Sequence, residues 1–246
     1  MWGDFVYIKC KTDKGMKRTN NQDYVLSLRG SKYDLLVVAD GMGGHNAGEI
    51  ASKLAATTIR DFIFENYNAY GDKEELIRDA IVKSNGIIFT QQLNNDDLKG
   101  MGTTTTCCII IGNEVVVGHV GDSRAYIVGE HGIRKITVDH SFVQALIKNG
   151  SITEDEAFNH PKRNLITRAV GTEAQVEVDT TKTKIEPSDI IFMCSDGLTS
   201  YINNDEIFEI IKDKKENAIE DLVRLANERG GSDNISVIIA SQEVER

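Results

Sequence analysis

The stretch from Leu35 to His45 constrains this chain more than any other part of it. A run of five apolar residues at positions 35–39 ends in Asp40, and a glycine-rich segment and His45 follow. Such a run is typical of a strand buried on both faces, so the Asp40 carboxylate is held by a rigid element and can face a cleft. The glycines let the backbone approach a ligand closely, and His45 can transfer a proton near neutral pH.

A second copy of this pattern lies far along the chain. The apolar residues 190–194 end in Ser195, Asp196 and Gly197. Either copy alone is readily explained as a strand that ends in an Asp-Gly turn. Two copies, taken with the acids described below, favour a shared functional site instead.

Composition excludes several classes of protein. The 246-residue chain is 40% hydrophobic and 27% charged, with a formal charge of −10, which disfavours binding to nucleic acid or an anionic membrane. It has no apolar run of about 18 residues and no visible signal peptide. The four cysteines form no C-x-x-C pair, so we expect buried, reduced thiols in a cytoplasmic protein.

Hydrophobic periodicity predicts an α+β fold. Helical patterns occur early and late, around a middle rich in β-branched strands joined by short turns, which indicates antiparallel sheets. We expect one domain over residues 1–246, a four-layer α-β-β-α sandwich of two mostly antiparallel sheets flanked by helix pairs, with a flap subdomain at about 141–172. The expected strands are 5–10, 25–28, 33–39, 103–111, 114–120, 125–128, 132–138, 176–183, 189–194 and 234–240. One expected helix begins after His45, and the others cover about 73–93, 142–148, 154–158, 205–211 and 217–228.

Five acids lie at boundaries between apolar strands and Gly, Ser or Asn turns. They are Asp23, Asp40, Asp122, Asp196 and Asp233. Singly, each is more readily a turn residue or a cap. If the sheets bring them to one edge, their mutual repulsion is best relieved by bound cations, and oxygen ligands favour Mg²⁺ or Mn²⁺ over zinc. Two such ions can share a water, lower its pKa and hold a phosphate oxygen.

Two further side chains complement this cluster. Arg18 offers a bidentate guanidinium to a phosphate, although a solvated surface arginine is the simpler reading of that residue alone. His45 can protonate a leaving oxygen as a general acid. The remaining histidines show no spacing typical of metal ligands and are interpreted as structural; they are His119, His131, His140 and His160.

Six short motifs in order make a resemblance specific. They are Arg18-x-x-Asn21-Gln22-Asp23, Asp40-Gly41-Met42-Gly43-Gly44-His45, Gly102-Thr103-Thr104, Gly121-Asp122-Ser123-Arg124, Ser195-Asp196-Gly197-Leu198 and Asp233-Asn234. This series resembles the metal-dependent protein phosphatases of the PPM family, also called PP2C, in their compact bacterial form, and spans residues 18–241. Gln22 stands where many members have Glu, and Ser236 where Thr is common.

The resemblance implies a role for each residue. Asp40 would bridge two Mn²⁺ or Mg²⁺ ions, with the Gly41 carbonyl on one of them, and Asp196 and Asp233 would complete the pair of sites. Asp122 would hold a third, weaker ion together with Asp196, and Asp23 would act through metal-bound water. Arg18 would bind the substrate phosphate, His45 would be the general acid, Asn234 would support Asp233, and the flap would modulate substrate access.

The implied activity is hydrolysis of phosphoserine and phosphothreonine by direct attack of water, without a phosphoenzyme. The protein partners would be a bacterial Ser/Thr kinase and its substrates, and the enzyme would be a monomer. The sequence disfavours other phosphatases, since it has no Cys-x₅-Arg, no Asp-x-Asp after its first apolar strand and no P-loop.

Two alternatives stay open. The first is a weakly active or inactive regulatory binding protein of the same fold. Such a protein would be marked by a lost metal aspartate, and none is lost. The second is an enzyme that acts on one narrow regulatory phosphoprotein, although such enzymes usually carry an added sensor domain.

Overall fold

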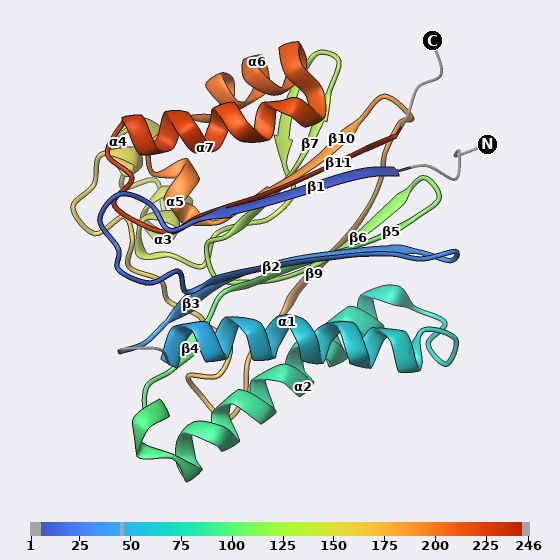
Figure 1. Cartoon of the computed structure of the whole chain (residues 1–246), viewed down its shortest axis with the longest axis vertical. Helices are drawn as coiled ribbons and strands as arrows, with labels where there is room; N and C mark the ends of the chain where they lie inside the picture. Colours follow the sequence, from blue (N-terminus) through green and yellow to red (C-terminus); the bar gives the residue numbers. More distant parts are fainter. Residues whose placement is uncertain (1–5, 45–46, 243–246) are drawn as a thin grey trace.

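Two antiparallel sheets lie face to face in the computed structural model, which describes residues 6–44 and 47–242 (Figure 1). The strands of the first sheet, in spatial order, are β1 (Val6–Asp13), β11 (Ile235–Gln242), β10 (Ile190–Cys194), β7 (Arg124–Gly129) and β8 (Gly132–Lys135). The second sheet runs β2 (Asp23–Arg29), β3 (Asp34–Met42), β5 (Thr105–Ile111), β6 (Glu114–Val120) and β9 (Asp179–Lys184), with the short β4 (Gly102–Thr103) paired to β3.

Helices cover the outer face of each sheet. Figure 1 shows α1 (Ala47–Asn66) and α2 (Lys73–Asn94) beneath the second sheet, and α6 (Asn204–Lys214) and α7 (Ala218–Glu228) above the first. The shorter helical elements are α3 (Phe142–Lys148), α4 (Glu154–Phe158), α5 (Asp196–Thr199), η1 (Asp96–Leu98) and η2 (Lys215–Asn217). The predicted four-layer α+β sandwich is therefore confirmed. No helix in the described ranges is long and apolar enough to cross a membrane.

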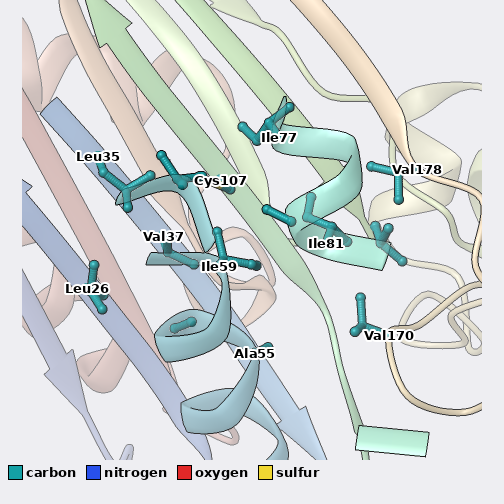
Figure 2. Packing of buried hydrophobic residues seen from close by; sticks show 14 of the residues in the cluster. Leu26, Leu35, Val37, Ala55, Ile59, Ile77, Ile81, Cys107, Val170 and Val178 are labelled. Atoms are coloured by element: carbon teal, nitrogen blue, oxygen red, sulfur yellow. The ribbon is translucent and has the colours of Figure 1, made fainter. Parts of the chain in front are cut away.

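Alternation along β3 explains its continuous apolar run. Leu35 and Val37 face α1 and α2 in one hydrophobic cluster (Figure 2), whereas Leu36 and Val38 face the core between the two sheets. In the first sheet, Phe192 of β10 likewise packs toward the helices α5–α7 while its neighbours pack between the sheets. A strand with helices on one side and a second sheet on the other must be apolar on both faces.

Several local predictions were wrong. Strand β8 ends at Lys135 rather than at 138 because the Ala125 N–H donates to the Thr137 hydroxyl instead of to a backbone carbonyl. Strand β9 begins at Asp179 rather than at 176, since its register against β6 starts there. Asp196 opens a short helix rather than a turn, and Cys10 is exposed, unlike the other cysteines. The predicted start of the first strand, at residue 5, lies outside the described residues.

Candidate active site

The strand ends bring five carboxylates to one edge of the two facing sheets. Asp23 and Asp40 are direct partners in the register of β2 against β3. Asp196 begins α5 immediately after β10, in the other sheet. Asp122 follows β6, and Asp233 precedes β11. The predicted convergence of acids from distant parts of the sequence is therefore present in the structure.

Electrostatic coupling among these acids reports how close they are. Burial raises the pKa of Asp40 well above its usual range, and the charges of the other four acids raise it further. Burial is also the main reason that the pKa of Asp23 rises to about 7 and that of Asp196 to about 6. Burial raises the pKa of Asp122, and the charge of Asp196 adds to the effect. Such a cluster must take up either protons or cations.

Two orphaned oxygen atoms test whether a cation fits. Asp23 Oδ1 and Asp196 Oδ1 are buried and have no hydrogen-bond partner in the described structure, and a buried carboxylate oxygen without a partner is costly. The donor set contains only oxygen, which suits Mg²⁺ or Mn²⁺. Within the described ranges, no three His, Cys, Asp or Glu side chains form a group that could hold a metal by themselves. Ions that retain several water ligands do not need such a cage.

Asp23 is held by a hydrogen bond that joins the two sheets. Ser195 Oγ donates to Asp23 Oδ2 over 2.8 Å and accepts from the Ser236 N–H over 2.9 Å. The hydroxyl therefore connects β2 of the second sheet to the start of β11 in the first. It joins the residue paired with Asp40 to the residue that precedes Asp196.

The backbone at Asp40 is fixed on both sides. Its N–H donates to Thr104 Oγ1 over 3.0 Å, and its carbonyl accepts from the Thr104 N–H over 2.8 Å and from Thr103 Oγ1 over 3.0 Å. Gly41, the predicted source of a carbonyl ligand, lies directly after it and donates its N–H to the Gln22 carbonyl over 3.1 Å. These bonds hold the end of β3 in position beside β2.

Arg18 lies at the mouth of the cluster. Its Nη2 donates to Asp233 Oδ2 over 2.8 Å, and its side chain is 49% exposed, so other guanidinium N–H groups remain available to an oxyanion. Asn234 fixes this arrangement from below. Its Oδ1 accepts from the Gln22 N–H, and its Nδ2 donates to the carbonyls of Lys14 and Asn20. These bonds tether the loop that carries Arg18, and the supporting role expected of Asn234 stays a prediction.

His45 is the one predicted site residue that lies outside the described residues. A cavity of about 550 Å³ adjoins the carboxylates, with Asp122 and Asp196 on its wall. Side chains of α3 and α4, within the expected flap at 141–172, line the opposite wall. The segment expected to control access therefore borders a space beside the acids.

Sequence reasoning missed several polar residues that build this site. Ser195 was treated only as part of a motif, and Thr104 was given no role. His140, interpreted as structural, donates its N–H to the Gly121 carbonyl, next to Asp122. Only the adjacency of Ser195 to Asp196 was a local signal. The other contacts are visible only after the sheets are formed.

Known proteins share this fold and sequence. The family model described as Protein phosphatase 2C matches residues 14–236. The Serine/threonine phosphatase stp of Listeria monocytogenes is 36% identical, with 97% of each chain covered. The crystal structure of the Mycobacterium tuberculosis serine/threonine phosphatase PstP/Ppp gives a TM-score of 0.89 at 35% identity, covering 97% of this chain and 99% of that one.

A further solved structure is the catalytic domain of the serine threonine protein phosphatase PstP in complex with 2 manganese ions. It gives a TM-score of 0.85 at 34% identity, with 96% of this chain and 97% of that one covered. The family model covers residues 14–236, and the two structural matches cover 96% or more of this chain. The chain belongs to the protein phosphatase 2C family.

Proposed function

We propose that this chain is a metal-dependent protein serine/threonine phosphatase that hydrolyses phosphoserine and phosphothreonine. One observation carries the proposal: strand ends from both sheets bring five carboxylates to one edge of a protein phosphatase 2C fold, beside Arg18 of the loop between β1 and β2. Relatives with this fold are named serine/threonine phosphatases, and one of them is seen with manganese. The intact set of acids argues against the alternative of an inactive binding protein.

The carboxylates would hold two Mn²⁺ or Mg²⁺ ions. Asp40 would bridge them, the Gly41 carbonyl would bind one, and Asp196 and Asp233 would complete the sites. When bound, such ions lower the pKa of water and stabilise charge on a phosphate oxygen. The two orphaned oxygens, on Asp23 and Asp196, support this assignment.

Two further acids would play accessory roles. Asp23, fixed by Ser195, would accept a hydrogen bond from water at the centre and so orient it. Asp122 would hold a third, weaker ion with Asp196, whose charge already raises the pKa of Asp122. Burial of both groups keeps bulk water from screening these interactions.

Arg18 and His45 would act on the substrate itself. The exposed guanidinium of Arg18 would bind the phosphate, with Asn234 keeping its loop in place. His45 would protonate the leaving oxygen as general acid. That assignment rests on the sequence, since His45 lies outside the described residues.

We infer the biological setting from family membership. The substrates would be phosphoserine and phosphothreonine proteins, among them a bacterial Ser/Thr kinase and its targets, in the cytoplasm. The chain would act as a monomer and a single domain. Segment 141–172 would be the flap that governs access, which its place on the wall of the adjoining cavity supports.

Hydrolysis of a phosphothreonine peptide with Mn²⁺ tests this proposal. We expect that EDTA, Asp40→Asn or Asp196→Asn each lowers kcat/KM about 100-fold or more, because each removes stabilisation of charge worth several kcal/mol. Asp213→Asn, on the exposed side of α6, is the matched control and should be silent. Activity that survives EDTA would disprove the metal mechanism, and a folded but inactive wild type would favour the binding protein.

The general acid needs its own test. His45→Ala should slow hydrolysis of the phosphothreonine peptide more than that of an activated aryl phosphate, whose leaving group needs no proton. The measurement is the ratio of kcat/KM for the two substrates in wild type and variant. An equal loss on both substrates would contradict this role.

A further inference from the structure

The segment 141–172 is rooted beside two of the site carboxylates. At its far end, Val170 and Thr103 exchange two backbone hydrogen bonds of 2.8 and 3.0 Å, and Thr103 Oγ1 donates to the Asp40 carbonyl. Val170 also packs into the core beneath the second sheet (Figure 2). At the other end, immediately before the segment, His140 contacts Gly121, the residue before Asp122.

His140 forms hydrogen bonds with both backbone polar groups of Gly121, its N–H and its carbonyl. Its backbone N–H donates to the Gly121 carbonyl over 2.6 Å, and its ring Nδ1 accepts from the Gly121 N–H over 3.0 Å. Gly121 has φ of +113°, and a Cβ there would lie 2.6 Å from the side chain of Thr104, so the turn is tightly built. Asp122 is the next residue along the chain.

The other side of the same ring faces Arg168, near the end of segment 141–172, and Asp179 of β9. Because Nδ1 accepts a hydrogen bond, a neutral ring carries its proton on Nε2, and Nε2 lies 3.2 Å from Asp179 Oδ2. With Nε2 protonated, Arg168 Nη1, 2.9 Å away, donates to Asp179 Oδ1 over 2.7 Å and not to the ring, so both donors point to one carboxylate. The Thr167 N–H also donates to the His140 carbonyl over 2.8 Å.

The surroundings keep the imidazole neutral and in one orientation. His140 is 8% exposed, and burial is the main reason that its pKa is lowered, with Asp179 opposing and Arg168 adding to the effect. The ring of His119 packs against it at 4.9 Å between centroids and is itself kept neutral by burial, with a pKa of about 4. The ring is therefore a fixed acceptor on one side and a fixed donor on the other.

Asp122 depends on this support. Its carboxylate is buried and accepts a hydrogen bond from its own backbone N–H, and among the described residues Arg124 acts on it through charge while no side chain donates a hydrogen bond to it. Its position is therefore set by the backbone of the turn, which His140 holds at Gly121. We propose that His140 is a positioning residue that fixes Asp122 for cation binding and couples it to the root of segment 141–172. This proposal rests on the proposed function, in which Asp122 is a ligand of the weakest ion.

Three substitutions separate the two sides of the ring. In His140→Asn the amide oxygen takes the place of Nδ1 and can still accept from Gly121, whereas in His140→Gln the longer side chain reaches toward Asp179 instead. His140→Ala removes both contacts. Asp122→Asn reports what loss of the ligand itself does.

The first measurement is hydrogen exchange of the Gly121 amide, read by NMR in the presence of EDTA. We expect protection in wild type and in His140→Asn, and lost protection in His140→Gln and His140→Ala. The second is calorimetric titration with Mn²⁺. The weakest site should lose about 10-fold in affinity in the Gln and Ala variants, as for residues that orient metal ligands, and stay within about 2-fold in the Asn variant.

Failure of this inference can be distinguished from failure of the proposed function. Equal behaviour of the Asn and Gln variants in both measurements would overturn the positioning role, as would an unchanged Ala variant. If Asp122→Asn leaves all Mn²⁺ binding unchanged, Asp122 is not a ligand and the inference fails, although phosphatase activity can persist. If Ala does not fold, the comparison between Asn and Gln still decides.

Discussion

The two Asp-Gly strand ends look alike in sequence and differ in structure. Asp40 stays within β3, which continues to Met42, whereas Asp196 begins the helix α5. The residue before the acid is the fully buried Ala39 in the first copy and Ser195 in the second, which hydrogen-bonds across to Asp23. A shared pattern therefore delivers one carboxylate from each sheet by two different backbone routes.

What the two copies share is the crowded backbone after the acid. A Cβ on Gly41 would lie 2.1 Å from the Gly48 carbonyl oxygen, and a Cβ on Gly197 would lie 1.9 Å from the Asn234 carbonyl oxygen. In both copies the glycine allows the backbone of another segment of this chain to pack closely against the site. The Asp-Gly pattern therefore indicates close packing of another backbone segment against the glycine, and not one type of turn.

The largest expected effect therefore comes from adding a methyl group at these glycines. Gly41→Ala and Gly197→Ala should each lower the free energy of unfolding by about 3 kcal/mol or more, because the contacts are with backbone atoms that cannot move aside. Urea denaturation measures this. Gly86→Ala, on the open surface of α2, is the control and should raise stability by about 1 kcal/mol. A mild loss at only one site would break the proposed equivalence of the two copies.

A pH effect of intermediate size should come from Asp23, which lies between the copies. Its pKa is about 7 in the folded protein against an ordinary 3.8, so in EDTA the folded state binds more protons than the unfolded state between these values. The titration of Asp23 should therefore by itself lower stability by about 2 kcal/mol from pH 5.5 to pH 8, and the raised pKa of Asp40 adds to the fall. Asp23→Asn should make this dependence shallower in urea denaturation, with a remainder from Asp40 and Asp196, while Asp213→Asn should leave it unchanged. Stability that rises over this pH range would contradict the account.

The smallest effect should separate the residues before the acids. Ser195→Ala removes the donor to Asp23 and the acceptor for the Ser236 N–H, which should cost about 1 kcal/mol as buried groups lose their partners. Ser84→Ala is the control, since that hydroxyl only bonds a carbonyl within its own helix. Equal stability of the two variants in thermal unfolding would show that the link between the sheets is unimportant.

The order of strands and helices could be predicted because each depends on local periodicity. The five acids could be predicted because each stands at the end of an apolar run. The helix α5 could not, since four residues are too few to show a helical period. The end of β8 depended on a side-chain acceptor, Thr137, that periodicity does not reveal.

Contacts between distant segments could not be predicted from the sequence. Ser195 and Asp23 are 172 residues apart and meet only when the two sheets face each other. His140 and Gly121 are 19 apart and meet because the β7–β8 hairpin returns the chain to the end of β6. Conversely, His140 has no metal-ligand spacing in the sequence, and the positioning role proposed for it needs none.

Mn²⁺ binding to wild type, Asp40→Asn and Asp196→Asn tests the central claim most directly, because that claim is that one strand end from each sheet supplies a single metal centre. Isothermal titration calorimetry at pH 8 would measure affinity and stoichiometry without reference to activity. Each substitution alone should weaken the tightest Mn²⁺ binding by about 100-fold or more. Wild-type affinity and stoichiometry in either variant would contradict the account.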